Sequence, residues 1–219
     1  MSSMDFLLLT KGPLLHLTLA IFVIGVGLRL GEIFTLGRRH NYALARGPEA
    51  PAAIKTVFAR SIPDPGTWQR APFDVVIGLV WHLCFFIVLF LFMPHVEVIK
   101  QTFGISWPTL PNPLINIFTV STLAALIAAL VQRIFHPVKR FLSRPEDYVV
   151  WLITFLPVLT GYLAYTRLVN PYPLILGLHI LSVEILLVAL PFTKLIHSFT
   201  IVAARWYNGA IFGRKGVQS

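Results

Sequence analysis

The chain has 219 residues, of which 56% are hydrophobic and only 12% carry a charge. A soluble globular domain has about twice that share of charged residues, so the composition excludes an ordinary soluble protein, and the single cysteine excludes a disulfide framework. The net charge is +9, but the basic residues lie beside apolar segments, as in membrane-protein loops, and we expect no nucleic-acid partner.

Five apolar segments have about the 20 residues that cross a hydrocarbon layer of about 30 Å. Pro13 and Asp74 lie in helix-starting positions of the first two segments. The fourth follows Ser143-Arg144-Pro145-Glu146, the Ser-x-x-Glu pattern of a capping box. We therefore predict an all-α membrane protein, one domain over 1–219, with five transmembrane helices at about 13–34, 73–94, 114–135, 147–166 and 173–199.

Lysine and arginine residues are unevenly distributed among the connections. Fifteen of the 18 lie in 29–73, in 133–144, or in the end of the fifth segment and the tail after it. Cytoplasmic loops are enriched in these residues, so we expect these regions in the cytoplasm. The N-terminus is then outside, the C-terminus is cytoplasmic, and the chain is a multi-pass protein of the cytoplasmic (inner) membrane.

The longest expected connection, the cytoplasmic loop 35–72, is rich in Pro, Gly and Ala. Within it, Ala53–Arg60 alternates apolar and basic residues on a helical period. Two interpretations of this segment stay open. It forms either a helix that lies on the membrane surface or a docking surface for a partner.

Seven histidines are many for so apolar a chain, because ionisable groups within a membrane are costly and usually functional. His40 and His136 lie in or beside basic loops, and we interpret them as ordinary loop residues. The second and fifth segments run in opposite directions, and each carries two of the others. Their depths match in pairs, one pair near each membrane face: His82 with His197 on the cytoplasmic side, and His95 with His179 on the outer side.

Helix geometry bears on both pairs. His179 and His197 are 18 residues apart, five helical turns, which predicts imidazoles on one face about 27 Å apart. His82 and His95 are 13 residues apart, about 140° off a common face. Either Pro94 kinks or rotates the end of the segment, or His16, also near the outer side, replaces His95 as a ligand.

Two histidines facing each other from neighbouring helices can hold a haem in six-coordination, a state suited to electron transfer. A single membrane histidine can equally serve in a hydrogen bond between helices. The two depth-matched pairs favour haem ligation.

The end of the fifth segment resembles the last span of the gamma subunit of respiratory nitrate reductase. Its pattern is His179, a long apolar run, and Pro191-Phe192-Thr193-Lys194-Leu195-Ile196-His197. Gly25–Arg29 gives weaker support. Ile105–Pro111, Arg144–Tyr148 and Thr160-Gly161 are similar to the membrane subunits of heterodisulfide-reductase-like and sulfite-reductase-linked complexes. The resemblance extends over nearly the whole chain.

This resemblance implies two non-covalent b-type haems with bis-histidine ligation, an inner one on His82 and His197 and an outer one on His95 and His179. It also implies quinol chemistry, with menaquinone or ubiquinone, near the outer haem. Electrons would pass between this quinone and a cytoplasmic iron–sulfur or molybdenum partner. The chain is then the electron-transfer subunit of a respiratory oxidoreductase, with no catalytic residue of its own.

Several other residues are candidates for supporting roles. Arg29, at the inner end of the first segment, could bind a haem propionate or anchor the helix at the interface. Lys100 and Glu97, just past His95, could contact quinone or relay its protons, and interface placement alone would also explain them. Glu184, midway along the fifth segment, must be protonated or hydrogen-bonded because an unpaired buried carboxylate is costly. Its role is in a proton path or beside a haem, or in a helix–helix hydrogen bond.

A different class of protein also fits the pattern. A haem-free transporter or membrane scaffold could use the same histidines and Glu184 for protons or for helix packing. Such a protein would purify without colour, whereas a dihaem cytochrome would not.

Overall fold

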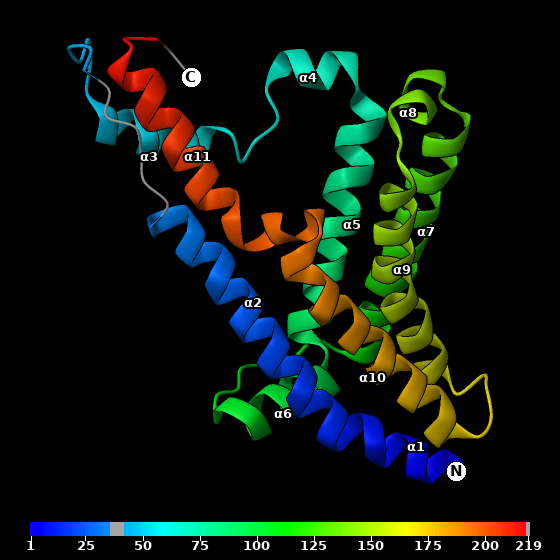
Figure 1. Ribbon diagram of the computed structural model, residues 1–219. Helices are drawn as coiled ribbons and strands as arrows, with labels where there is room; N and C mark the ends of the chain where they lie inside the picture. Colours follow the sequence, from blue (N-terminus) through cyan, green and yellow to red (C-terminus); the bar gives the residue numbers. More distant parts are fainter. Residues whose placement is uncertain (36–41, 218–219) are drawn as a thin grey trace. The chain divides into compact units, whose positions relative to one another are not determined.

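The computed structural model describes residues 1–35 and 42–217 (Figure 1). All regular structure in these residues is helical, without a strand, and five helical stretches are long and apolar enough to cross a membrane. The predictions of an all-helical fold and of five candidate spans are confirmed. Many large apolar side chains on these stretches are exposed, as lipid contact requires: Val23, Leu79, Ile117, Leu152 and Ile185 are examples.

The chain forms two compact units, described separately: unit 1 comprises Met1–His16 and Ala71–Leu186, and unit 2 comprises Leu17–Arg70 and Leu187–Ser219. The helices, in chain order, are α1 (Ser3–Leu9), η1 (Thr10–Leu14), α2 (Leu15–Thr35), α3 (Glu49–Ala59), α4 (Pro65–Arg70), α5 (Pro72–Leu91), α6 (Met93–Phe103), α7 (Asn112–Phe135), α8 (Pro137–Leu142), α9 (Pro145–Thr166), α10 (Tyr172–Ala189), η2 (Leu190–Phe192), η3 (Lys194–Ile196) and α11 (His197–Arg214).

In unit 1, α7 packs against both α5 and α9. Its buried side chains include Ile115 and Leu126. Trp151 of α9 donates its indole N–H to the carbonyl oxygen of Leu126 at 2.8 Å. The hydroxyls of Thr119 and Thr122 are buried and bond to carbonyls of α7 itself. These small side chains allow close packing of helices inside a membrane.

The second candidate span is shorter than predicted. It ends at Leu91 instead of 94, Phe92 is extended, and a separate helix, α6, begins at Met93. Pro94 has no N–H to bond the carbonyl of Phe90, and the indole N–H of Trp107 bonds that oxygen instead. The chain therefore breaks here, and the expected kink beside Pro94 is a full helix end.

The first candidate span is longer than the predicted 13–34. It begins at Ser3, where Ser2 and Asp5 form a capping box, and runs through a π-helical turn to Thr35. Pro13 lies inside that turn instead of starting a helix. Neighbouring Gly12 has non-helical dihedral angles, which lets the chain continue past the proline.

The predicted capping of the fourth span is wrong in its residues. The helix begins at Pro145, and Asp147 accepts the N–H of Arg144 at 2.8 Å. Ser143 instead donates its hydroxyl to the carbonyl oxygen of Lys139 at 2.7 Å. The carboxylate of Asp147, the third residue of the helix, thus caps it by accepting the N–H of the N-cap residue, Arg144.

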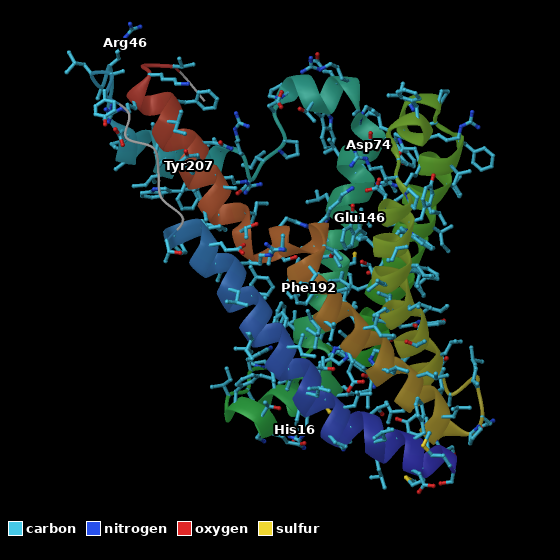
Figure 2. All side chains as sticks on the ribbon, in the orientation of Figure 1. His16, Arg46, Asp74, Glu146, Phe192 and Tyr207 are labelled. Carbon is cyan, nitrogen blue, oxygen red and sulfur yellow. The ribbon has the colours of Figure 1, made fainter. Side chains whose placement is uncertain are left out.

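The predicted fifth span, 173–199, is not one continuous helix. The α-helix ends at Ala189, Thr193 is extended, and His197 begins α11. Pro191 lacks the N–H that a helix needs at that point. Phe192 lies in this bent segment (Figure 2). The expectation that His179 and His197 lie on one helix face, five turns apart, is therefore wrong.

In unit 2, α3 packs against α11 (Figure 1). Ala53 and Thr56 of α3 are fully buried. A Cβ added to Gly209 of α11 would lie 2.7 Å from the Cα atom of Ala53, and Gly213 is equally crowded by α3. The segment interpreted as either a membrane-surface helix or a docking surface is helical up to Ala59, and one of its faces is covered by a second helix of the same chain.

Candidate functional site

The break after α5 positions His95. Its ring lies in the first turn of α6, and its Nδ1 is 3.1 Å from the carbonyl oxygen of Val88 near the end of α5. A carbonyl can only accept, so Nδ1 carries the hydrogen. Burial lowers the pKa of His95 below its ordinary value, so the ring is neutral at neutral pH.

A neighbouring helix positions His179. Its Nδ1 is 3.1 Å from the carbonyl oxygen of Pro157 and 3.4 Å from the hydroxyl of Thr160, both on α9. Ser182 lies 3.1 Å from the Thr160 hydroxyl and donates to the backbone carbonyl of His179 at 2.7 Å. Because the Pro157 oxygen can only accept, His179 also carries its hydrogen on Nδ1.

The two rings lie together in unit 1. Their centroids are 6.2 Å apart and their planes differ by 19°. Phe92 packs edge-on against His95, at a centroid distance of 5.2 Å. Of the two outer candidates that the sequence offered, His95 is thus a neighbour of His179. His16 is exposed on α2, with its Nδ1 2.9 Å from the carbonyl oxygen of Gly12.

In a neutral ring that carries its hydrogen on Nδ1, the other nitrogen, Nε2, has the lone pair that binds metals. Among the residues that the structure describes, none hydrogen-bonds to Nε2 of His95 or His179. Metal–nitrogen bonds of about 2 Å on each side, with about 1 Å from each nitrogen to its ring centre, give a centroid separation of about 6 Å. The observed 6.2 Å fits one metal ion between the rings.

The donor set favours haem over a bare metal ion. In the described residues there is no group of three or more His, Cys, Asp or Glu side chains that could hold a metal ion. Two axial histidines are sufficient for a haem, because the porphyrin supplies the other ligands. The His95–His179 pair therefore fits a bis-histidine haem.

Gly161 provides the space beside His179. A Cβ at this position would lie 2.9 Å from Cε1 and 3.2 Å from Nδ1 of the imidazole. Only a glycine leaves room for the ring here. Thr160 thus offers a hydroxyl to His179, and Gly161 leaves space for the same imidazole.

The two histidines of the second expected pair, His82 and His197, belong to different units. His82, in unit 1, has its Nδ1 2.6 Å from the carbonyl oxygen of Gly78, and the ring of Trp81 lies against the imidazole at a centroid distance of 3.7 Å, tilted by 34°. His197, in unit 2, has its Nδ1 2.8 Å from the carbonyl oxygen of Lys194. Both rings thus have the same Nδ1 arrangement as the outer pair, and their pairing stays a prediction.

The other predicted residues have the following surroundings. Arg29 donates to the carbonyl oxygen of Pro191 at 3.1 Å and to the carboxylate of Glu32 at 2.8 Å. Lys100 and Glu97 are exposed on α6, the helix that carries His95. Glu97 accepts a hydrogen bond from the amide of Gln101 at 3.1 Å.

Glu184 is 2% exposed, and neither carboxylate oxygen has a hydrogen-bond partner in the described residues. Of the two states expected for it, hydrogen-bonded or protonated, this environment favours the protonated one. Burying a charge without a partner is far more costly than burying a neutral carboxyl group.

Sequence reasoning missed most of the residues that support His179. Neither Pro157 nor Ser182 was predicted to contact this histidine. The sequence signals for such a contact are a proline inside a membrane helix and a Thr-Gly pair one turn later. The proline leaves a backbone carbonyl without its usual N–H donor, and the glycine leaves space for a side chain of a neighbouring helix.

A protein of Nitratidesulfovibrio vulgaris (strain Hildenborough), named only "Protein", is 26% identical to this chain over 212 residues. The match covers 93% of this chain and 92% of that protein, so the likeness runs through all five candidate spans. No protein-family model and no solved structure matches the chain.

Proposed function

We propose that this chain is the dihaem cytochrome b membrane subunit of a respiratory oxidoreductase, similar to the gamma subunit of nitrate reductase and to heterodisulfide-reductase-linked membrane subunits. It transfers electrons between membrane quinone and a cytoplasmic iron–sulfur or molybdenum partner. The observation that supports this most is the pair of imidazoles, His95 and His179, with Nδ1 atoms held by carbonyls and centroids 6.2 Å apart.

In this proposal His95 and His179 hold the outer haem, and His82 and His197 hold the inner one. A bound haem supplies one-electron transfer. Pro157 and Thr160 orient His179 through its Nδ1–H, the outer-shell contact that fixes a ligand's tautomer. The carbonyl of Val88 does the same for His95.

The proposed orientation places the N-terminus outside and the C-terminus in the cytoplasm. It rests on the distribution of Lys and Arg. The outer haem then lies near the quinone site, for which Lys100 and Glu97 are candidates because they are exposed on the same short helix as His95. Glu184, protonated in its buried position, is a candidate proton carrier.

Mixing the purified, haem-loaded chain in nanodiscs with a reduced quinol analogue tests the electron-transfer role. We expect the α band of reduced haem b to appear, and Lys100→Met to slow its appearance while dithionite still reduces the haem fully. Haem that dithionite reduces but no quinol analogue does would contradict the quinone assignment.

A further inference from the structure

A cavity of about 290 Å³ lies in unit 1 between one end of α5, the end of α7 and the short helix α8. One part of its lining is apolar, with Ile77, Trp81 and Leu142. The other part is polar, with Asp74, Arg133 and Lys139. The cavity therefore suits an amphipathic ligand.

The cavity lies at the ends of two candidate membrane spans. Asp74 is in the first turn of α5 and Arg133 is in the last turn of α7, so two candidate spans have their ends here. Figure 2 shows Asp74 near the end of α5 beside α8. Helix ends of this kind lie at the boundary between the hydrocarbon and the polar headgroups.

The charges of the lining differ in how they are used. Lys139 is engaged twice, since its ammonium group bonds both the carboxylate of Asp74 and, at 2.6 Å, the amide oxygen of Gln132. The charges of Lys139 and Asp74 cancel each other. The remaining charged side chain of the lining is Arg133, which is positive.

The guanidinium of Arg133 is incompletely used. Among the described residues its one direct hydrogen bond goes to the hydroxyl of Ser143 at 3.1 Å. Arg133 also forms an ion pair with Asp147 at 3.7 Å, a separation too long for a hydrogen bond, and the same carboxylate oxygen caps α9 by accepting the N–H of Arg144. A guanidinium presents five N–H donors in a fork that matches phosphate oxygens.

We infer that this cavity binds the phosphodiester headgroup of an anionic phospholipid. Arg133 donates to the phosphate oxygens, and the acyl chains leave along Ile77, Trp81 and Leu142. Basic pockets between membrane helices bind anionic headgroups in this way. A free phosphate would use the Arg133 fork but not the apolar wall.

The bound lipid would also touch the surroundings of His82. Gly78 and Trp81 both line the cavity. The carbonyl of Gly78 bonds the Nδ1 atom of His82, and the ring of Trp81 lies against the imidazole. The lipid would thus support the two residues that fix this histidine, whether or not the chain carries haem.

Native mass spectrometry of the delipidated full chain, titrated with phosphatidylglycerol, phosphatidylcholine or inorganic phosphate, tests the inference. We expect phosphatidylglycerol to bind more tightly than phosphatidylcholine. Arg133→Gln should weaken phosphatidylglycerol binding about tenfold, the effect of losing one charge-assisted contact. Arg140→Gln is the matched control, because Arg140 is exposed on α8 and does not line the cavity.

Ala129→Phe, which fills the apolar part of the cavity without changing charge, should weaken lipid binding as well. It keeps the test valid if Arg133→Gln lowers the yield of folded protein. Equal loss of binding in Arg133→Gln and Arg140→Gln would overturn the inference, as would displacement of the lipid by inorganic phosphate at equal concentration. None of these outcomes depends on haem, so the proposed function is tested separately.

Discussion

The imidazole of His95 lies 6.2 Å from that of His179, centroid to centroid, with the two planes 19° apart. The rings come from helices α6 and α10, and carbonyls of α5 and α9 hold their Nδ1 atoms. Four helical segments thus cooperate to place two lone-pair nitrogens in one small region. In the proposed function, a haem iron held between the two rings would use both nitrogens as its axial ligands.

Replacing either histidine tests this pair. We expect His95→Ala and His179→Ala each to lower the haem content from two per chain to one, because a six-coordinate haem needs both axial ligands. The pyridine haemochromogen assay measures the content. His136→Ala, at the end of α7 outside the pair, should keep both haems, and two haems in His179→Ala would disprove the assignment.

Gly161→Ala tests the space beside His179. The added methyl group would approach the imidazole to 2.9 Å, so the ring must move and its Nδ1 contacts must lengthen. We expect the electron paramagnetic resonance g values of one haem to change and those of the other haem to stay the same. Gly27→Ala has open space around the new methyl and should leave both signals unchanged. Identical spectra for Gly161→Ala and the wild type would count against this role.

Glu184 is expected to be neutral in its buried site. Replacing it by Met removes an unsatisfied polar group, which should raise the melting midpoint, since each kcal/mol corresponds to about 2–4 °C in a chain of this size. Thermal unfolding in detergent followed by circular dichroism measures this. A clear fall in the midpoint, in both Glu184→Met and Glu184→Gln, would instead reveal an ionised carboxylate with a partner.

The packing of α3 on α11 depends on small residues. Gly209→Ala would place a methyl group 2.7 Å from the Cα atom of Ala53, which we expect to cost about 1–3 kcal/mol in helix packing. Trypsin should then cut faster at Lys55 and Arg60 of the loosened helix. Gly31→Ala in α2 meets no atom within 4 Å and is the control. Equal digestion rates would contradict this packing.

Length and apolar character were sufficient to predict the five candidate spans. The helix breaks at Phe92 and Thr193 were not predicted, because prolines are tolerated inside packed membrane helices and sequence alone does not separate a kink from an end. Because the helix breaks before Thr193, His179 and His197 do not lie on one helix.

The outer histidine pair was predicted from depth, and Thr160-Gly161 was singled out by the resemblance, but the contacts of Pro157 and Thr160 with His179 were not predicted. Pro157 and Thr160 lie on a helix that adjoins His179 only through tertiary packing. The α3–α11 contact was also missed, although Gly209 and Gly213 are spaced as Gly-x-x-x-Gly, a pattern of close helix contact.

The dithionite-reduced minus oxidised absorption spectrum of the purified chain, expressed with ample haem and scaled to protein concentration, tests the central claim most directly. The account predicts a b-type α band with two haems per chain, one of which disappears in His179→Ala. A chain that is folded by circular dichroism and colourless in this spectrum would contradict it and favour the haem-free transporter or scaffold.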